Sequence, residues 1–222
     1  GGARLNAALA RAREQWAFSG LRFTSADGER TLLGCLRGAH TLASLHLANL
    51  GLTAEIPLAL GAVKARGCYV DLSGNRAIRL ASDARAVATE PHLDFSACSL
   101  TGAIPDALCA CGALAQLNLE ENEFEGEIPV ALLRWKFVEG RVVELRGNAG
   151  LRLPANLGEL GAAVVRLDLA DHNLQGRIPE SIGALGQLRE LSLFKNRLEG
   201  EIPPSLGQLT TLQTLNLSWN LL

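Results

Sequence analysis

The feature that most constrains this chain is a leucine pattern that recurs about every 24 residues. It is clearest from Leu188 to Leu209, which reads LRELSLFKNRLEGEIPPSLGQL. The Leu, Asn, Gly, Ile and Pro residues of this stretch stand at the same offsets elsewhere in the chain. A unit of this length cannot bury its apolar face alone and must stack on its neighbours, so the period predicts a solenoid.

Within one repeat, the spacing predicts the local structure. Leu191 and Leu193 flank Ser192, and this alternation is typical of a short strand with leucines inside and serine outside. Asn196 follows at a turn, where a side-chain amide can satisfy backbone groups that neighbouring coils leave unpaired. Gly200 allows a tight path, and Pro203 ends the strand because it has no N–H to donate. We therefore interpret Asn196 as structural and expect binding on the outward strand positions.

The pattern recurs over residues 42–222 as about eight repeats, the last of them incomplete. The segment from Ser82 to Thr89 lacks the Ile-Pro pair and predicts a short Ala-rich helix. We interpret Cys98 as a structural substitute for the turn asparagine. The turn positions of the eight repeats are Leu50, Asn75, Cys98, Asn122, Asn148, His172, Asn196 and Asn220.

Residues 1–41 lie outside the pattern and predict a helical and irregular N-terminal cap. Leu5, Leu9, Ala12 and Trp16 stand at helical spacing among arginines. A capping helix is the favoured interpretation, because a solenoid must close its open end with an atypical element. A basic membrane-surface helix or part of a targeting peptide is the alternative.

Composition narrows the class of partner. The chain is 48% hydrophobic and 20% charged, with a formal net charge of −2, so neither nucleic acid nor an anionic membrane is the expected partner. No run of 18 apolar residues occurs, and we expect no transmembrane segment in this chain. The usage of 18 Arg against 3 Lys suggests a GC-rich genome, such as an algal one.

The compound motif L-x-x-L-x-L-x-x-N-x-L followed by x-G-x-I-P resembles that of plant-type leucine-rich repeats. The resemblance covers about residues 42–222. It implies an α/β solenoid, a right-handed superhelix with a parallel concave sheet and short convex strands or helical turns. It also implies a recognition role, since the family includes receptor-kinase ectodomains, inhibitors of cell-wall enzymes and ice-binding proteins.

No catalytic constellation is evident. The four histidines are dispersed, no Ser, Cys or Asp stands with them at a recognised spacing, and phosphate-binding loops are absent. Cys109 and Cys111 could form half of a metal site, but small buried or convex-side thiols are the favoured interpretation. We expect a non-enzymatic protein with no cofactor, no metal and no catalytic residues.

The outward strand positions predict an acidic stripe on the concave face. Such a stripe could receive a basic segment of a protein partner. The alternative is an ordinary solvated face, because Asp and Asn are common at these positions. The central outward residues of successive repeats are His46, Asp71, Asp94, Asn118, Glu144, Asp168, Ser192 and Asn216.

A second candidate surface lies in the last two repeats. Exposed aromatic residues with arginine are typical of an interface hot spot, although Phe194 and Trp219 could instead only stack on each other. The residues of this surface are Arg166, Arg189, Glu190, Phe194, Lys195 and Trp219.

These features favour a scaffold or complex subunit that binds proteins through its concave face and its C-terminal end. The alternative is a receptor-like ectodomain that senses an extracellular ligand. Ice binding is less favoured, because the outward face mixes acidic, basic and aromatic residues. The five scattered cysteines, and a single N-glycosylation sequon at Asn216-Leu217-Ser218, favour an intracellular or organellar location.

Overall fold

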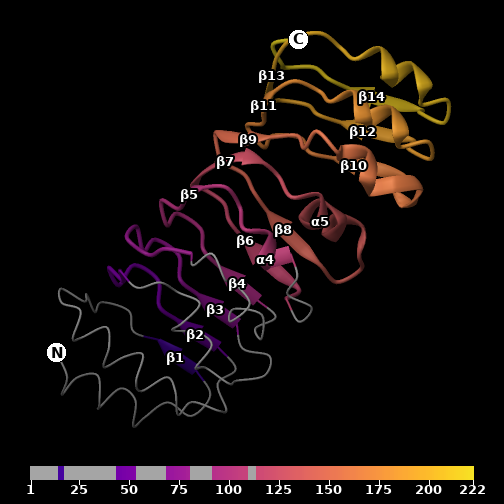
Figure 1. Ribbon diagram of the computed structural model, residues 1–222. Coiled ribbons are helices and arrows are strands. Elements are labelled where there is room, and N and C mark those ends of the chain that lie inside the picture. The colour runs from indigo at the N-terminus through magenta and orange to yellow at the C-terminus, as the bar shows by residue number, and fades with distance from the viewer. Residues whose placement is uncertain (1–14, 18–43, 54–68, 81–91, 110–113) are drawn as a thin grey trace, which may run out of the picture. The chain divides into compact units, whose positions relative to one another are not determined.

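The computed structural model describes residues 15–17, 44–53, 69–80, 92–109 and 114–222 (Figure 1). The chain divides into two compact units. Unit 1 comprises Gly1–Leu100, Pro105–Asn122 and Gly140–Glu144, and unit 2 comprises Thr101–Ile104, Glu123–Glu139 and Leu145–Leu222. In the described residues of both units, a three-residue strand recurs once per repeat.

Unit 1 contains a six-stranded sheet in the order β1-β2-β3-β4-β6-β8, with every described pair parallel. Each strand pairs residue for residue with the equivalent strand of the next coil. Parallel pairing follows from the repeat, because every coil enters its strand in the same direction. The strands are β1 (Gln15–Ala17), β2 (Ser44–His46), β3 (Tyr69–Asp71), β4 (His92–Asp94), β6 (Gln116–Asn118) and β8 (Val142–Glu144).

Strand β1 corrects one prediction. Helical spacing had placed Trp16 on a capping helix, but Gln15–Ala17 is a strand that pairs with β2, with Trp16 opposite Leu45. Pairing with an existing sheet edge outweighs weak local helix propensity. The remainder of the predicted cap, residues 1–14 and 18–41, lies outside the described residues, as does the helix predicted at 82–89.

Unit 2 carries two parallel sheets. One has the order β10-β12-β14, and its strands lie at the same position within the repeat as the strands of the unit 1 sheet. The other has the order β13-β11-β9-β7-β5 and lies along one side of the unit in Figure 1. The first consists of β10 (Arg166–Asp168), β12 (Glu190–Ser192) and β14 (Thr214–Asn216); the second consists of β5 (Thr101–Gly102), β7 (Glu123–Glu127), β9 (Gly150–Arg152), β11 (Gln175–Gly176) and β13 (Arg197–Leu198).

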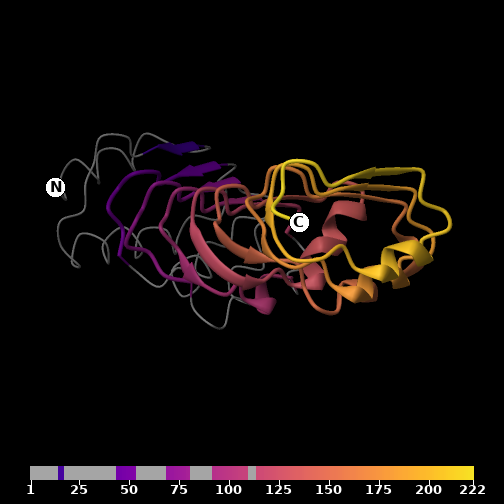
Figure 2. The same ribbon diagram turned by 90° about the horizontal axis from the view of Figure 1, so that it is seen from above.

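Short helical turns follow the Ile-Pro positions. Pro179 and Pro203 stand immediately before η4 and η5, which fits the role of proline as a strand terminator. Figure 2 shows the yellow strand β14 at the upper edge of unit 2 and the yellow helical turn η5 at the lower edge. The helices are α4 (Asp106–Cys109) in unit 1 and α5 (Val130–Leu133), η2 (Arg134–Phe137), η3 (Leu157–Ala163), η4 (Glu180–Ala184) and η5 (Pro204–Gln208) in unit 2.

The core of both units is a column of aliphatic side chains from successive coils. The middle residues of most described three-residue strands are buried in this core, and Leu45, Leu117 and Leu167 are each at most 1% exposed. The strand-and-turn pattern read from the sequence is therefore confirmed, as is an α/β solenoid with parallel strands and helical turns.

A buried asparagine ladder fastens each coil to its neighbour. The Asn122 Oδ1 atom accepts hydrogen bonds from the backbone N–H groups of Cys98 and Leu100, at 3.0 and 2.9 Å. Its Nδ2 donates to the carbonyl oxygens of Phe95 and Leu119, at 2.8 and 3.0 Å. Asn75 and Asn196 make the same four kinds of contact. The structural role predicted for the turn asparagine is confirmed.

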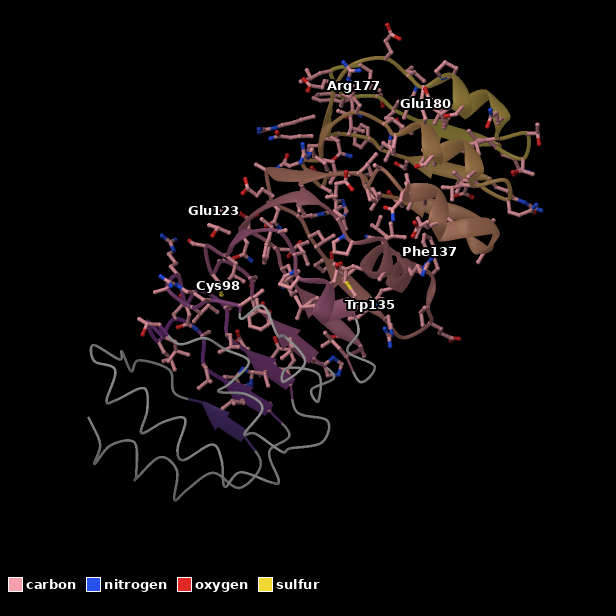
Figure 3. All side chains as sticks on the ribbon, viewed as in Figure 1. Cys98, Glu123, Trp135, Phe137, Arg177 and Glu180 are labelled. Carbon is pink, nitrogen blue, oxygen red and sulfur yellow. The ribbon has the colours of Figure 1, made fainter. Side chains whose placement is uncertain are left out.

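Two residues that replace asparagine in the ladder, Cys98 and His172, keep part of its hydrogen bonding. The Cys98 Sγ donates to the Leu72 carbonyl oxygen at 3.2 Å, and the His172 Nδ1 lies 2.6 Å from the Ala170 carbonyl oxygen. Both side chains are buried, at 0% and 5% exposed, and the position of Cys98 can be followed in Figure 3. Cys98 is therefore structural, as its sequence position predicts.

We expect the Cys98 thiol to resist alkylation in the folded protein. Burial raises its pKa to about 11 from the ordinary 9.0, so the reactive thiolate is scarce at pH 8 and forms only as the pH approaches 11. Peptide mapping after iodoacetamide treatment at pH 8 should find Cys98 unmodified until urea unfolds the chain. The half-buried Cys109 is the comparison within the chain. Equal labelling of both thiols in the folded state would contradict the buried placement.

Candidate protein-binding face

The first and third residues of β2, β3, β4, β6 and β8 share one side of the six-stranded sheet, which we call the unit 1 polar face. The third residues are in register from strand to strand, so His46, Asp71, Asp94, Asn118 and Glu144 form one continuous row. The unit 1 residues of the predicted acidic stripe therefore lie next to one another on adjacent strands. In unit 2, Asp168, Ser192 and Asn216 form the equivalent row on β10, β12 and β14.

Most residues of these rows also stabilise the turn that follows their strand. The Asp94 Oδ1 accepts a hydrogen bond from the Ser96 N–H at 2.9 Å, and the Asn118 Oδ1 does the same for Glu120 at 3.0 Å. Asp71, Asp168 and Asn216 make the same bond to the residue two positions on. Such Asx turns require Asp or Asn, which gives these positions a structural reason for their composition. Only one oxygen of each carboxylate is used in this way.

The first residues of the strands form a second row that the sequence interpretation overlooked. Tyr69, His92, Gln116 and Val142 lie opposite one another in register. The sequence could have predicted this row, because residues two apart on a strand point to the same side of the sheet. Aromatic rings gather at one end, with ring centroids 5.7 Å apart for His46 and Tyr69 and 6.4 Å apart for Tyr69 and His92.

Polar contacts link the two rows. Burial raises the pKa of the Tyr69 hydroxyl, and the carboxylates of Asp94 and Asp71, together with a hydrogen bond to Asp94, raise it further. On its other side, the Asp94 Oδ2 accepts a hydrogen bond from the Asn118 Nδ2 at 3.4 Å. The His46 Nδ1 lies 3.6 Å from the Asp71 Oδ2, which forms an ion pair when the imidazole is protonated. Asp94 is thus held in place by the groups around it.

A hollow of about 270 Å³ lies between the two rows, which we call the strand-face hollow. Leu93 and Leu117 form its floor, and both are almost fully buried. One wall combines aromatic, aliphatic and amide side chains, and the other carries the carboxylates. The wall residues are Tyr69, His92, Gln116 and Val142 on one side and Asp94, Asn118 and Glu144 on the other.

In unit 2, the predicted charged residues pair with one another. The Arg166 guanidinium lies 3.3 Å from the Glu190 carboxylate and 3.6 Å from that of Asp168. These side chains are about half exposed or more, so each pair contributes little stability. Arg189 stands directly before β12, and its carbonyl oxygen accepts hydrogen bonds from the N–H groups of Gln213 and Thr214.

Of the two aromatic residues predicted to lie exposed in the last two repeats, Trp219 is exposed and Phe194 is half-buried. Trp219 is 76% exposed, and the described residues show no ring contact between it and Phe194. Trp219 and Lys195 occupy the position just before the ladder asparagine, where φ is 60° and 55°. This left-handed turn position directs both side chains outward. Lys195 also lies 3.1 Å from the Asp171 carboxylate.

Among the residues that the structure describes, no group of three or more His, Cys, Asp or Glu side chains could hold a metal ion. Cys111 lies outside the described residues, so the Cys109 and Cys111 pair is not tested. No helix in the described ranges is both long enough and apolar enough to cross a bilayer.

The fold and this face define a class of protein: a solenoid of parallel strands that presents a rigid polar surface. A leucine-rich-repeat family model matches residues 92–111 and 187–209. The chain is 31% identical over 168 residues to Receptor-like protein 35 of Arabidopsis thaliana, which covers 72% of this chain and 17% of that protein. The chain is a leucine-rich-repeat protein of the plant type.

Solved structures of plant ectodomains share its fold. The ectodomain of the Arabidopsis thaliana receptor kinase GASSHO1/SCHENGEN3, in complex with CASPARIAN STRIP INTEGRITY FACTOR 2, matches with 31% identity and a TM-score of 0.54 over 84% of this chain and 22% of that chain. The Arabidopsis receptor kinase HAESA ectodomain, in complex with an extended IDA peptide hormone, matches with 30% identity and a TM-score of 0.50 over 84% and 31%. The chain therefore spans less than a third of the length of each relative, and its fold is typically a protein-interaction module.

Proposed function

We propose that the chain is a non-enzymatic, ligand-binding part of a receptor-like ectodomain, and that its unit 1 polar face binds a basic, extended segment of a protein or peptide. The single observation that carries this proposal is the strand-face hollow, with Tyr69 and Val142 in one wall and the Asp94 and Glu144 carboxylates in the other. Two similar ectodomains were solved with a protein factor or a peptide hormone bound, which supports a peptide-sized ligand.

The two walls suit the two parts of a lysine or arginine side chain. Its aliphatic stem can pack along Tyr69 and Val142, the latter 42% exposed in the described structure. Its cationic head can then meet the Asp94 and Glu144 carboxylates. Tyr69 adds an aromatic ring, whose face attracts cations. An acidic or purely apolar segment would leave these carboxylates desolvated and unpaired.

A binding experiment tests this proposal. The probe is an acetylated and amidated nonapeptide with three arginines spaced by glycine and serine, and its affinity is measured by calorimetry at two salt concentrations. We expect the double variant Asp94→Asn with Glu144→Gln to bind at least about tenfold more weakly, which corresponds to about 1.4 kcal/mol. We also expect the wild-type affinity to fall with added salt, since exposed charges are screened.

Two features of the chain make this test specific. Asparagine at position 94 keeps the Asx turn, because Asn118 already makes that turn in the next coil. The matched control is Asp106→Asn, an exposed carboxylate on α4 rather than on the polar face. Equal weakening by the control, or equal binding of a peptide with glutamates in place of arginines, would contradict the proposed face.

A second candidate function is a scaffold that docks proteins through unit 2. The observation in its favour is the exposure of Trp219 in the coil next to that of the charged Lys195, since tryptophan is common at interface hot spots. Mild purification of the native protein, followed by mass spectrometry of the proteins that co-purify with it, should then find stable partner subunits. Replacement of Phe194 and Trp219 with alanine should weaken their retention, and unchanged retention would contradict this function.

A further inference from the structure

The five-stranded sheet of unit 2 carries opposite charges on neighbouring strands. Strand β7 holds three exposed glutamates, and exposed arginines lie on β9 and β13 and directly after β11. Backbone pairing places Glu127 of β7 opposite Arg152 of β9. Gln175 of β11 lies opposite both Arg152 and Arg197 of β13. We call this surface the lateral face; its charged residues are Glu123, Glu125, Glu127, Arg152, Arg177 and Arg197, and Figure 3 labels Glu123 and Arg177.

The arginines of the lateral face are supported by the sheet but not paired with an acid. The Arg152 Cδ lies 3.2 Å from the position that a Cβ atom of Gly176 would occupy, and the Arg177 Nε lies 3.1 Å from that of Gly200. Each side chain therefore lies across the next coil, in space that a glycine leaves open. Within the described residues, neither arginine forms an ion pair, nor does Arg197. A guanidinium with this support loses less freedom when a carboxylate binds it.

The glutamates of β7 are equally open. Glu123 and Glu125 are exposed and form no ion pair with any described residue. The Glu127 Oε2 accepts a hydrogen bond from the Ala155 N–H at 3.1 Å, so one carboxylate oxygen is used within the chain. On the three-stranded sheet of unit 2, by contrast, an arginine and a glutamate pair with each other at 3.3 Å. The lateral face thus presents two adjacent sets of opposite charges that its own chain leaves unpaired.

This pattern of charge selects the kind of partner. A long polyanion, such as a nucleic acid or an acidic polysaccharide, would meet the glutamates of β7 beside the arginines and the exposed Glu199 after β13. A uniformly basic partner would meet the arginines in the same way. A surface that fits must carry an acidic strand beside basic strands at the same spacing. The lateral face has this pattern itself, so it is complementary to a copy of itself.

We propose that the lateral face binds the lateral face of a second copy of the chain. Adjacent strands lie about 4.8 Å apart, so β7 and β11 are about 10 Å apart with β9 between them. A twofold axis through β9, perpendicular to the sheet, places β7 of each copy over β11 of the other. The glutamates of each copy then meet the arginines of the other, and both sets of ion pairs form together. Such an isologous contact closes at two copies.

The proposal goes beyond ligand binding by the unit 1 polar face, because it concerns another sheet and requires no ligand. Exposed ion pairs are individually weak, so the dimer is expected to be reversible and sensitive to salt. The arginines do not depend on an uncovered last strand. Strand β13 is followed by another described coil, in which Glu199 pairs with Leu221 and the Leu221 N–H donates to the Leu198 carbonyl oxygen at 2.7 Å.

Analytical ultracentrifugation of the full 222-residue chain, over a range of protein concentrations, tests the proposal. We expect a concentration-dependent dimer at about 0.1 M salt. It should dissociate at about 1 M salt, because the Debye length falls from about 10 Å to about 3 Å. Glu123→Arg with Glu125→Arg should be monomeric, as should Arg152→Glu with Arg177→Glu, because each places like charges against each other. An equimolar mixture of these two variants should restore a dimer, since the reversed charges are then opposite again.

Glu139→Arg with Glu159→Arg is the matched control. It makes the same change in net charge as the β7 variant, at two exposed glutamates of unit 2 outside the lateral face. This control should dimerise like the wild-type chain. A wild-type chain that stays monomeric at every concentration would overturn the proposal and leave the lateral face to a partner of another kind. A dimer that persists in either lateral-face variant, loss of the dimer in the control, or two folded variants whose mixture stays monomeric would overturn it as well.

Discussion

Replacement of Asn196 with alanine is expected to lower the free energy of unfolding by about 3–5 kcal/mol. Asn196 is 7% exposed, and its Oδ1 accepts the N–H groups of His172 and Leu174 at 3.1 and 3.0 Å. Its Nδ2 donates to two further backbone carbonyl oxygens. Alanine leaves these groups buried without partners, and each such loss costs about 1–3 kcal/mol. Urea unfolding, followed by the fluorescence of the buried Trp135 in the same unit, measures the effect.

Asn216→Ala is the matched control for this prediction. Both asparagines lie in unit 2, but the Asn216 side chain points outward and, among the described residues, bonds only to Ser218. Because its partners remain accessible to water, we expect a loss of about 1 kcal/mol or less. Similar losses for the two variants would mean that the buried ladder is not the source of the stability between coils.

Replacement of Gly183 with alanine is expected to cost about 2–3 kcal/mol. A Cβ atom at Gly183 would stand 2.7 Å from the Ser205 carbonyl oxygen and 2.8 Å from the Ser205 Cβ. Ser205 lies on η5, the helical turn packed against η4, so the added methyl must push the two turns apart. Overpacking of this kind typically costs about 1–3 kcal/mol. A Cβ atom at Gly158 would likewise stand 2.6 Å from the Ser181 carbonyl oxygen of η4.

Gly186→Ala, three residues further along the same coil, is the control. A Cβ atom there has no neighbour within 4 Å, and the residue is exposed. Alanine restricts the unfolded chain, so stability should stay unchanged or rise by about 0.5–1 kcal/mol. Thermal unfolding of the two variants side by side measures the difference. A loss at Gly186 as large as at Gly183 would contradict close packing of the helical turns.

Part of the candidate site could be predicted from the sequence. Asp71, Asp94, Asn118 and Glu144 were expected on one outward row, because period-2 alternation fixes the side on which each residue lies. The first-position row and the aromatic group around Tyr69 were overlooked, although the same alternation places them. The hydrogen bond from Tyr69 to Asp94 could not be predicted, since it joins different rows on neighbouring strands.

Strand β1 marks another limit of the sequence. The spacing around Trp16 fits a helix, and local propensity alone gives no reason to expect a strand there. The strand exists because the edge of β2 offers backbone partners along its whole length. A short segment takes the conformation that pairs its backbone hydrogen-bonding groups with those of its neighbour. Only the tertiary structure shows which segment that neighbour is.

The sequence by itself determined the coil: the buried leucines, the ladder and the turns after Pro179 and Pro203. These depend on spacing within one repeat and on contact with the next repeat, so the period is enough to specify them. The tertiary structure alone decided which outward side chains meet. Successive third positions from His46 to Glu144 are separated by 25, 23, 24 and 26 residues, yet the strands stay in register. The hollow arises from that register, because the backbone bonds between strands fix it while the segments between them absorb the differences in length.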